Sequence, residues 1–356
     1  MINATVYIAT FHCVPNYGAV LQTYGLYKYL RTLFKEVSVL DYRPDTLLKE
    51  YRNINWYSLG STFMSFWSLF PFLKKKKAFR KFEKRIMLTS VSGKKPEDFI
   101  SLLCDYLFVG SDQIWNPNVT CGFDSVYFGY FPMVSHPKVI SYAASLGKIT
   151  FSDNELTQMQ EMLRTVDCIS VREQEAMDLL SAKFDLKSSV VADPTILAGI
   201  DTFKELVGDV QYEHYLFVYT LTNNPSTLQV AKQVAKDKGL RIIQVNGNRK
   251  PLRRPNHTII NDAGPEEFLS LLYHSDFVVT DSFHGTVFSC LFHVPFITIP
   301  HKTRGGRMVT LLSELGLTDR LTESSAVCYE DICWTEADSK IERMRQKSIE
   351  FINQSI

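Results

Sequence analysis

The sequence predicts an α/β protein with two Rossmann-like domains that face each other across a crevice, followed by a C-terminal helix. Three observations lead to this fold class. Short β-branched and aromatic runs alternate with stretches of helical periodicity, a pattern typical of parallel sheets covered by helices on both faces. The alternation restarts after Asp193-Pro194, which gives two series of similar length. The 356 residues also suit two domains at about 150 residues each.

The first series opens with a strand and a long helix. A strand is expected at Ala4–Thr10, and Tyr17–Phe34 is expected to be helical because Val20, Tyr24 and Tyr27 recur on one stripe. Further strands are expected at Val37–Asp41, Asp105–Val109, Lys138–Ala143, Cys168–Val171 and Val190–Ala192, and further helices at Asn154–Arg164 and Glu173–Ser181.

The second series repeats this alternation. Tyr215–Leu221 is a strand candidate, and Ser226–Lys238 is a helix candidate that Gly239 ends. Strands are also expected at Arg241–Val245, Phe277–Thr280 and Phe296–Ile299, and helices at Pro265–His274, Gly285–Phe292, Met308–Gly316 and Glu336–Ile356. The expected domains are therefore residues 1–197, with an insertion at about 51–90, and residues 198–356. The hinge is expected near Pro194–Thr202.

Composition narrows the class of protein. A hydrophobic content of 45% and a charged content of 22% exclude a disordered tail protein. The 39 Lys and Arg balance 38 Asp and Glu, and a net charge of +1 argues against bulk nucleic-acid binding. The N-terminus lacks the pattern of a signal peptide, and no stretch is apolar enough to span a bilayer.

The seven cysteines are predicted to be buried free thiols. Their number is odd, no two form a CxxC pair, and no zinc-ligand spacing with histidine is present. Most are flanked by apolar residues, which is typical of buried cysteines. Such a set fits the reducing cytoplasm.

One segment, Trp56–Arg85, interrupts the alternation. Its aromatic residues include Phe63, Phe66, Trp67, Phe70 and Phe72, and its cations are Lys74–Lys77, Arg80, Lys81, Lys84 and Arg85. This combination suits a membrane surface, where rings lie among the headgroups and cations meet anionic lipids. The alternative is an insertion whose aromatic side chains pack on the first domain and whose lysines are solvated.

Ligands of open α/β sheets bind beyond the carboxyl ends of the strands. After the first strand come Asn16, Tyr17 and Gly18, where a glycine allows close approach and helix amides can hold an anion. The alternative is an ordinary loop with an asparagine cap.

The segment after the third strand in sequence is rich in polar side chains. It contains Ser111, Asp112, Trp115 and Asn116. Asp112 could orient sugar hydroxyls or act as a base, and Trp115 could stack on a sugar face. Equally, Asp112 could cap a turn or helix and Trp115 could belong to the core.

Two further strand ends offer candidates. Ser145 follows the strand that ends at Ala143, and Arg172 follows the strand that ends at Val171. A guanidinium group at that point can bind a phosphate or carboxylate with two hydrogen bonds. The alternative is a surface ion pair between Arg172 and Glu175.

The segment Thr280–Thr286 has the sharpest pattern. After an apolar strand, Asp281, Ser282, His284, Gly285 and Thr286 open a helix of small residues. The imidazole can move a proton near neutral pH, and the amides of Gly285 and Thr286 can hold a phosphate. The alternative is a histidine that serves as a structural cap.

A basic loop follows the next strand. Lys302, Arg304 and Arg307 surround two glycines and form a candidate anion pocket, unless they are simply solvated. The sequence lacks GxxxxGK[ST], GxGxxG, HExxH, GxSxG and DxD motifs. The candidates therefore suit an anionic substrate and acid–base chemistry, with no metal and no cofactor required.

In combination these segments resemble the polysaccharide pyruvyl transferase family. The matching segments, in the family's order, are NYGAVLQTYGL at Asn16–Leu26, VGSDQIWN at Val109–Asn116, YAASLG at Tyr142–Gly147, SVRE at Ser170–Glu173, ADPTIL at Ala192–Leu197 and TDSFHGTVFS at Thr280–Ser289. Each motif is modest alone, but together they are specific.

The resemblance implies a GT-B-like fold and transfer of the enolpyruvyl unit of phosphoenolpyruvate to a sugar, with release of phosphate. It implies His284 as general acid, Arg172 as a clamp on phosphate or carboxylate, and Lys302 as a weaker basic match. The first domain would take the sugar acceptor of a capsule, cell-wall polysaccharide or exopolysaccharide. That acceptor is often carried on a lipid diphosphate at the cytoplasmic membrane face.

One departure leaves other functions open. Many family members have arginine two places before the histidine, where this chain has Ser282. The missing charge would have to come from Lys302, Arg304 or Arg307. The alternatives are a nucleotide-sugar glycosyltransferase of the same fold and a catalytically degenerate sugar-binding scaffold.

Overall fold

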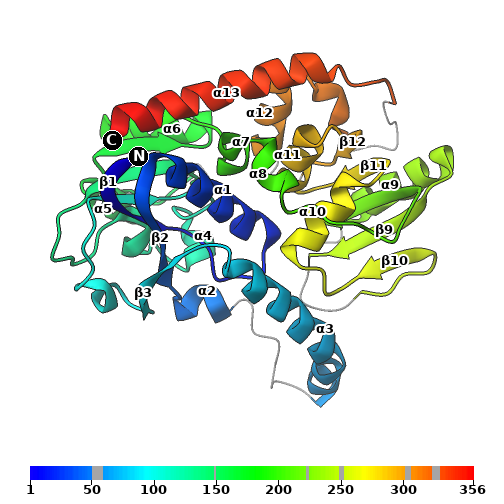
Figure 1. Cartoon of the computed structure of the whole chain (residues 1–356), viewed down its shortest axis with the longest axis horizontal. Coiled ribbons are helices and arrows are strands. Elements are labelled where there is room, and N and C mark those ends of the chain that lie inside the picture. The colour runs from blue at the N-terminus through cyan, green and yellow to red at the C-terminus, as the bar shows by residue number, and fades with distance from the viewer. Residues whose placement is uncertain (50–58, 148–149, 222–223, 248–251, 301–305, 323–328) are drawn as a thin grey trace.

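The computed structural model describes residues 1–356 except 50–58, 148–149, 222–223, 248–251, 301–305 and 323–328. Two parallel sheets with helices packed around them lie side by side (Figure 1). The predicted fold class, an α/β protein with two Rossmann-like domains and a C-terminal helix, is confirmed. The first sheet ends at Val190 and the second begins at Tyr215, with the short helices α7 (Pro194–Ala198) and α8 (Ile200–Lys204) between them.

The first sheet has seven strands in the order β3-β2-β1-β4-β5-β6-β7. Its strands are β1 (Ile2–Ala9), β2 (Phe34–Tyr42), β3 (Leu88–Gly93), β4 (Tyr106–Val109), β5 (Lys138–Ala144), β6 (Cys168–Val171) and β7 (Ser189–Val190). Its helices are α1 (Tyr17–Leu33), α2 (Asp45–Lys49), α4 (Pro117–Thr120), α5 (Asp153–Leu163) and α6 (Gln174–Phe184). A further helix, α3 (Leu59–Glu83), leaves this domain.

The second sheet has five strands in the order β10-β9-β8-β11-β12. They are β8 (Tyr215–Thr220), β9 (Arg241–Asn246), β10 (His257–Ile260), β11 (Phe277–Thr280) and β12 (Phe296–Thr298). The helices are α9 (Pro225–Lys238), α10 (Pro265–Tyr273), α11 (Phe283–Leu291), α12 (Gly306–Leu315) and α13 (Trp334–Ser355). Because all described pairings are parallel, the carboxyl ends of the strands in each sheet meet at one edge.

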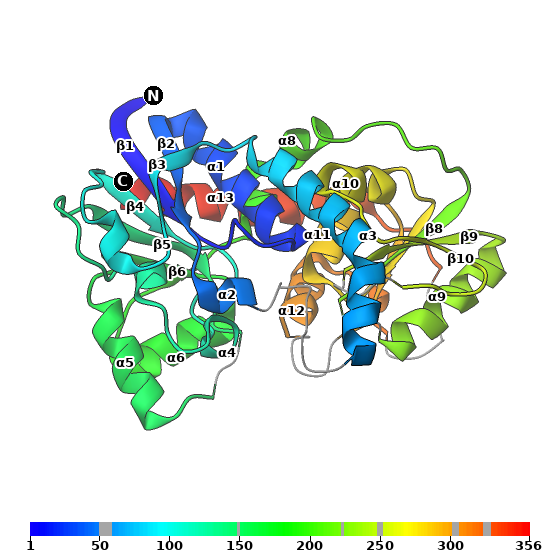
Figure 2. The same cartoon turned by 90° about the horizontal axis from the view of Figure 1, so that it is seen from below.

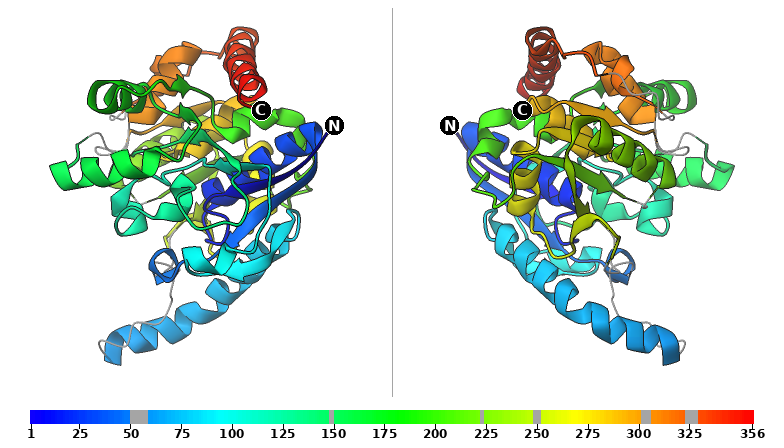
Figure 3. Two further views of the ribbon diagram at one scale, coloured as in Figure 1. Left: turned by 90° about the vertical axis from the view of Figure 1, so that its left-hand side faces the viewer. Right: turned by 90° about the vertical axis from the view of Figure 1, so that its right-hand side faces the viewer.

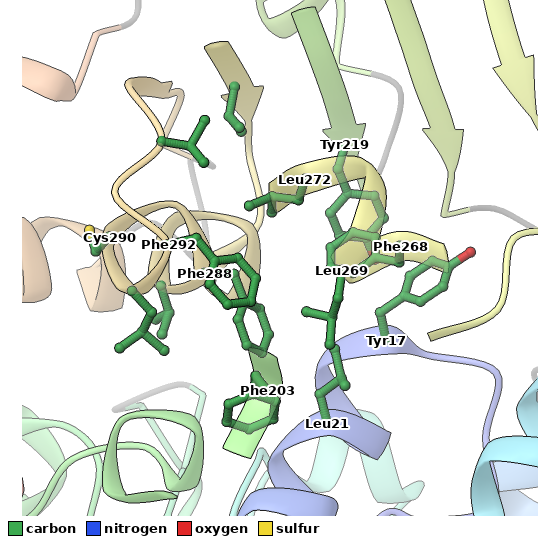
Figure 4. Close-up of a cluster of buried hydrophobic side chains, with 14 of the residues drawn as sticks. Tyr17, Leu21, Phe203, Tyr219, Phe268, Leu269, Leu272, Phe288, Cys290 and Phe292 are labelled. Carbon is green, nitrogen blue, oxygen red and sulfur yellow. The ribbon is translucent and has the colours of Figure 1, made fainter. Parts of the chain in front are cut away.

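Helix α1 joins the two domains. It is buried on nearly all sides, as expected of a helix with apolar residues around its circumference. Figure 4 shows Tyr17 and Leu21 of α1 in one cluster with Phe268 and Leu269 of α10. The rings of Tyr17 and Phe268 stack at 4.6 Å, and the Tyr17 hydroxyl donates to the Ala263 carbonyl at 2.8 Å. The two domains therefore share part of their hydrophobic core.

Helix α13 runs from the second domain back across the first (Figure 1). The Ala192 amide donates to Ser348 Oγ at 2.9 Å, and Arg345 Nε donates to the Leu197 carbonyl at 2.9 Å. Ile352 is buried in a core cluster of the first domain. The C-terminal helix thus packs on both domains.

Helix α3 reaches from the first domain to the underside of the second (Figure 2). Phe79 and Phe82 join the core that the domains share. Lys75 is 5% exposed, so the expectation of solvated lysines is wrong at that position. Phe63, Phe66 and Trp67 belong to α3, but their side chains lie outside the described residues. The proposed insertion at 51–90 also overlaps β3, which is the edge strand of the first sheet.

Burial of the cysteines differs in part from the prediction. Cys104 and Cys290 are buried free thiols, whereas Cys121 and Cys333 are exposed. Cys328 lies outside the described residues. Among the helices of the described part of the chain, none has the length and apolar character that a membrane span requires.

Candidate active site

The N-termini of α1 and α11 meet in the crevice between the domains. Ser282 caps α11, and its hydroxyl accepts from the Gly285 amide at 3.4 Å. His284, in the first turn of this helix, packs against Gly18 of α1. A Cβ atom on Gly18 would lie 2.2 Å from His284 Nδ1. Gly18 therefore makes room for the imidazole, and the expectation that it makes room for a ligand is corrected.

A buried carboxylate connects Arg172 and His284, two of the three predicted catalytic residues. Asp193 Oδ2 lies 2.9 Å from Arg172 Nη2 and 3.6 Å from His284 Nε2. Its other oxygen, Oδ1, accepts from the amide and hydroxyl of Thr195 at 2.9 and 2.6 Å. Burial alone would raise the pKa of Asp193, but the charges of Arg172 and His284 hold it below its ordinary value. The carboxylate is thus ionised and faces both groups.

Arg172 is buried at the carboxyl end of β6, which rules out the alternative of a surface ion pair. Its Nη2 atom donates to Ser111 Oγ. Nε and Nη1 have no hydrogen-bond partner within the described residues. Because a buried donor without a partner costs about 1–3 kcal/mol, these atoms indicate a place where a ligand oxygen can bind.

A second guanidinium group lies nearby. The Arg172 and Arg307 guanidinium carbons lie 5.3 and 5.6 Å from the centre of the Phe283 ring. Burial and the charge of Arg172 lower the pKa of Arg307. Arg307 Nε lies 3.8 Å from Glu173 Oε1, and Glu173 also accepts from Ser145 Oγ at 2.5 Å. Asp193 and Glu173 each face one of the two cations. The Nε and Nη1 atoms of Arg172, unpaired within the described residues, leave room for an anion beside Phe283.

Two cavities meet at Phe283 and Arg307. The larger, about 630 Å³, is lined by Arg172, Asp193 and the inner face of α13. The smaller, about 200 Å³, is lined by polar side chains and His284. Its polar lining residues include Asn16, Asp112, Gln113, Asn118, Asp281 and Ser282. The arrangement therefore offers a cavity lined by the guanidinium groups of Arg172 and Arg307 on one side and a hydrogen-bonding cavity on the other.

Several predicted binding residues are structural instead. Trp115 is 0% exposed, donates to the Tyr127 carbonyl at 2.9 Å and stacks on Phe128, so it cannot stack on a sugar. Tyr17 is buried in the shared core. Asn116 is a buried cap of α4 that donates to Gln113. The rings of Trp115 and Tyr17 are buried because they pack in the core, which is the alternative stated for Trp115.

The backbone amides at the start of α11 already donate hydrogen bonds within the helix. The Thr286 amide donates to the Ser282 carbonyl at 3.0 Å, and the Gly285 amide donates to Ser282 Oγ. These amides are therefore not free to hold a phosphate. A Cβ atom on Gly285 would lie 2.5 Å from Thr280 Oγ1, so that glycine allows helix and strand to approach each other.

The two acidic residues predicted for the site, Asp281 and Asp112, differ in how many hydrogen bonds their carboxylates already accept. Asp281 lines the smaller cavity but accepts from Thr220 Oγ1 at 2.6 Å and the Leu221 amide at 2.7 Å, so it mainly ties β11 to β8. Asp112 is half-buried, with a φ of 75°. Within the described residues, its carboxylate accepts one hydrogen bond, from the adjacent Gln113 amide at 2.8 Å. Lys302 and Arg304 lie outside the described residues.

Sequence reasoning assigned no role to Asp193, Glu173 or Phe283. Asp193 precedes Pro194 and caps α7. An aspartate before a proline is typical of a helix start, so the local sequence provides no reason to assign Asp193 a second role. The available signal was the match of ADPTIL to the family pattern. Among the described residues, no group of three or more His, Cys, Asp or Glu side chains is placed to hold a metal ion.

Comparison with solved structures gives matches along nearly the whole chain at low identity. An S. aureus MnaA–UDP structure matches at TM-score 0.49 and 13% identity, covering 97% of this chain and 90% of that chain. An alpha-glucosyltransferase in complex with UDP and a 13-mer DNA matches at 0.49 and 10%, covering 99% and 93%. A UDP-GlcNAc 2-epimerase from Neisseria meningitidis bound to UDP-GlcNAc matches at 0.46 and 12%, also covering 99% and 93%.

A family model gives the assignment. No curated protein sequence matches the chain. The model described as polysaccharide pyruvyl transferase matches residues 16–303. This range includes Arg172, Asp193 and His284, the three residues that meet in the crevice. Since the match spans most of the chain, the protein belongs to the polysaccharide pyruvyl transferase family.

Proposed function

We propose that the protein transfers the enolpyruvyl unit of phosphoenolpyruvate to a sugar, forms a pyruvate ketal and releases phosphate. The observation that carries this proposal is the contact of Asp193 with both Arg172 and His284, beside two guanidinium donors without a partner in the described structure. This arrangement places an anion-binding group next to a group that can move a proton.

The donor would bind beside Phe283. Arg172 Nε and Nη1 suit two oxygens of a phosphate or carboxylate, and Arg307 adds a second charge. Arg307 would also replace the arginine that many family members carry where this chain has Ser282. The sugar would bind in the smaller cavity, where Asp112 and Asn16 can accept and donate hydrogen bonds to hydroxyls.

The chemistry follows from these positions. His284 gives a proton to the methylene carbon, and the adjacent carbon, now electron-poor, is attacked by one sugar hydroxyl. That hydroxyl loses its proton, and the neutral imidazole can accept it. The bond from this carbon to the phosphate oxygen then breaks and phosphate leaves. A second hydroxyl attacks the same carbon to close the ketal, and the departing phosphate accepts its proton. Asp193 would hold the imidazole and the Arg172 guanidinium in position throughout.

The acceptor and location form part of the proposal. A lipid-diphosphate-linked precursor of a capsule, cell-wall polysaccharide or exopolysaccharide would supply the sugar. We place the enzyme in the cytoplasm, at the inner face of the membrane, where the free thiols of Cys104 and Cys290 stay reduced. No metal and no cofactor other than the donor enters this mechanism.

The first test measures turnover. The protein is incubated with phosphoenolpyruvate and a panel of lipid-linked sugars, and released phosphate is measured with the mass gain of a pyruvate ketal. We expect His284→Gln to lower kcat by at least about a hundredfold, the contribution of a general acid. His274→Gln, which changes an exposed histidine after α10, is the matched control and should keep full activity.

A binding measurement separates the donor site from the choice of acceptor. Titration calorimetry with phosphoenolpyruvate should show binding that Arg172→Gln abolishes and His284→Gln retains. Turnover of a UDP-sugar without phosphoenolpyruvate would instead show glycosyl transfer. Biological function that survives His284→Gln would show a scaffold.

A further inference from the structure

Helix α3 has two faces of opposite character over its described side chains. At 3.6 residues per turn, Lys75, Phe79 and Phe82 lie on one side, and all three are buried. The opposite side is exposed, and we call it the outer face of α3. It consists of Phe70, Leu73, Lys76, Lys77, Arg80 and Lys81, and Lys84 in the turn after the helix continues it.

The inner side and its flanks are bound to the second domain. Lys75 Nζ donates to the Asn246 carbonyl at 2.8 Å. Lys74 Nζ lies 2.6 Å from Asp262 Oδ2, and Arg85 contacts Glu266. These three cations are therefore engaged within the molecule. They differ from the cations of the outer face, although the sequence places them all in one run.

The five cations of the outer face differ, because the described part of the chain offers them no such partners. Lys76, Lys77, Arg80, Lys81 and Lys84 are exposed, and no ion pair joins them to any residue in the described ranges. The one acid nearby in the helix, Glu83, is bound to Arg43 at 2.8 Å. Five positive charges thus lie along this face and the turn after it, with no acid paired to them among the described residues.

Apolar side chains extend the same face. Phe70 is 77% exposed and Leu73 is 52% exposed, which places two large apolar groups in solvent beside the cations. Figure 3 shows the N-terminal half of α3 projecting beyond the rest of the molecule. The exposed side chains of this face are therefore accessible from solvent, on a helix that extends beyond both domains.

We propose that the outer face of α3 docks on an anionic lipid bilayer. Cations together with exposed apolar groups on one side of a helix match a bilayer surface, where phosphate-bearing headgroups overlie hydrocarbon. Phe70 and Leu73 would enter the boundary between headgroups and acyl chains, and the five cations would meet the lipid phosphates. This docking needs no substrate, so its test is independent of the proposed function.

The test uses the full chain and vesicles. Sedimentation with vesicles that contain phosphatidylglycerol should pull the protein down, and vesicles of phosphatidylcholine alone should leave it in solution. Binding should fall as salt rises, since the Debye length shrinks from about 10 Å at 0.1 M to about 3 Å at 1 M. Phe70→Ser with Leu73→Ser should weaken the binding that remains at high salt.

A matched pair of variants locates the surface. Changing Lys76, Lys77, Arg80, Lys81 and Lys84 to Gln should weaken binding at least tenfold, because each cation contributes about fivefold near an anionic surface. The control changes the same number of exposed lysines on and beside α6, α8 and α9, namely Lys183, Lys187, Lys204, Lys232 and Lys236. It should keep the binding of the unchanged protein, and both variants should keep its melting temperature.

Three outcomes would overturn the proposal. The unchanged protein fails to bind phosphatidylglycerol vesicles, or the control loses as much binding as the α3 variant. Alternatively, a single-stranded RNA competes for the same face with higher affinity than the vesicles, which would assign the face to nucleic acid.

Discussion

Asp193 determines how Arg172 and His284 are presented to a ligand. Its Oδ2 atom faces both side chains, while Oδ1 is fixed by the amide and hydroxyl of Thr195. The carboxylate therefore cannot turn away without losing two hydrogen bonds. Because it neutralises part of the charge on Arg172, it also makes burial of that guanidinium group tolerable. Activity and stability should both depend on this one side chain.

Asp193→Asn tests both effects. The amide keeps the size and can still accept from Thr195, but it removes the charge that faces Arg172 and His284. We expect kcat to fall at least about tenfold through misplacement of the imidazole. We also expect the free energy of unfolding to fall by about 3–5 kcal/mol, the usual cost of breaking a buried ion pair.

The pH dependence gives a second readout of Asp193. Its pKa is lowered in the folded state, so its contribution is complete above the unfolded pKa of about 3.9 and is lost as pH falls below it. Urea unfolding should therefore show a constant difference between the two proteins from neutral pH to about pH 5, shrinking at lower pH. A difference that grows on acidification would contradict this role.

The ends of buried strands predict part of the site from the sequence alone. His284 and Arg172 could be found because Arg172 directly follows a buried strand and His284 opens the helix after another, where ligands of open sheets bind. Asp193 could not be found in this way. Its role as the cap of α7 already explains an aspartate at this position, and its contact with His284 is made between the two domains. Trp115 was ambiguous for a different reason, because a ring beside polar residues suits a core and a sugar site equally well.

At the scale of elements, α3 carries a buried lysine between the two domains. Lys75 Nζ donates to the Asn246 carbonyl and lies 4.9 Å from the centre of the Tyr17 ring. Among the described residues, no acid forms an ion pair with it. Burial lowers the pKa of Lys75 to about 8, with Asp262 opposing the change. Helix α3 thus packs against the second domain with a buried ammonium group, and the free-energy penalty of burying that charge depends on pH.

Lys75→Met should reveal that dependence. The folded pKa of about 8 lies below the unfolded value of about 10.4, so the folded state gives up its proton first. Burial of the charge costs stability below about pH 8, and this cost disappears as pH rises toward 10.4. The unfolding free energy of the unchanged protein, relative to Lys75→Met, should therefore rise by up to about 3 kcal/mol across that window.

The variant itself provides the comparison. Both proteins are unfolded with denaturant at about pH 7.5, just below the window from about 8 to 10.4, and at about pH 8.5 and 9.5 within it. In the difference between their unfolding free energies, the titration of all groups that the two proteins share cancels. A difference that stays flat, or that falls with pH, would show that burial does not lower the pKa of Lys75.

The elements that sequence reasoning found differ in kind from those it missed. Strands buried on both faces, such as β6 and β11, read as continuous apolar runs and were found with their observed bounds. The edge strands β3 and β10 were missed, because Leu88–Gly93 is mostly polar or small and the short His257–Ile260 follows a basic, proline-containing segment. Edge strands need only one neighbour, so their composition is less constrained.

In the whole molecule, three connections fix the crevice. The shared core joins α1 to α10, α3 crosses beneath the second domain, and α13 returns over the first. Neither domain alone contains the site, because Arg172 and Asp193 precede α7 whereas His284 and Arg307 follow it. The contact of Gly18 with His284 marks the place where the two halves meet.

Gly18→Ala tests whether this contact sets the catalytic geometry. Alanine is the better helix former by about 1 kcal/mol, so a Gly18 with free space around it would give a more stable protein after the change. The Cβ atom would instead lie 2.2 Å from His284 Nδ1, and either the imidazole or the domains must move. We expect a lower melting temperature and a loss of kcat of at least about tenfold, since a displacement of about 1 Å can cost a hundredfold. Gly208→Ala is the control, because a Cβ atom there meets nothing within 4 Å, and it should leave kcat unchanged. Full activity with a raised melting temperature in Gly18→Ala would show that His284 does not depend on the close approach of the two helices.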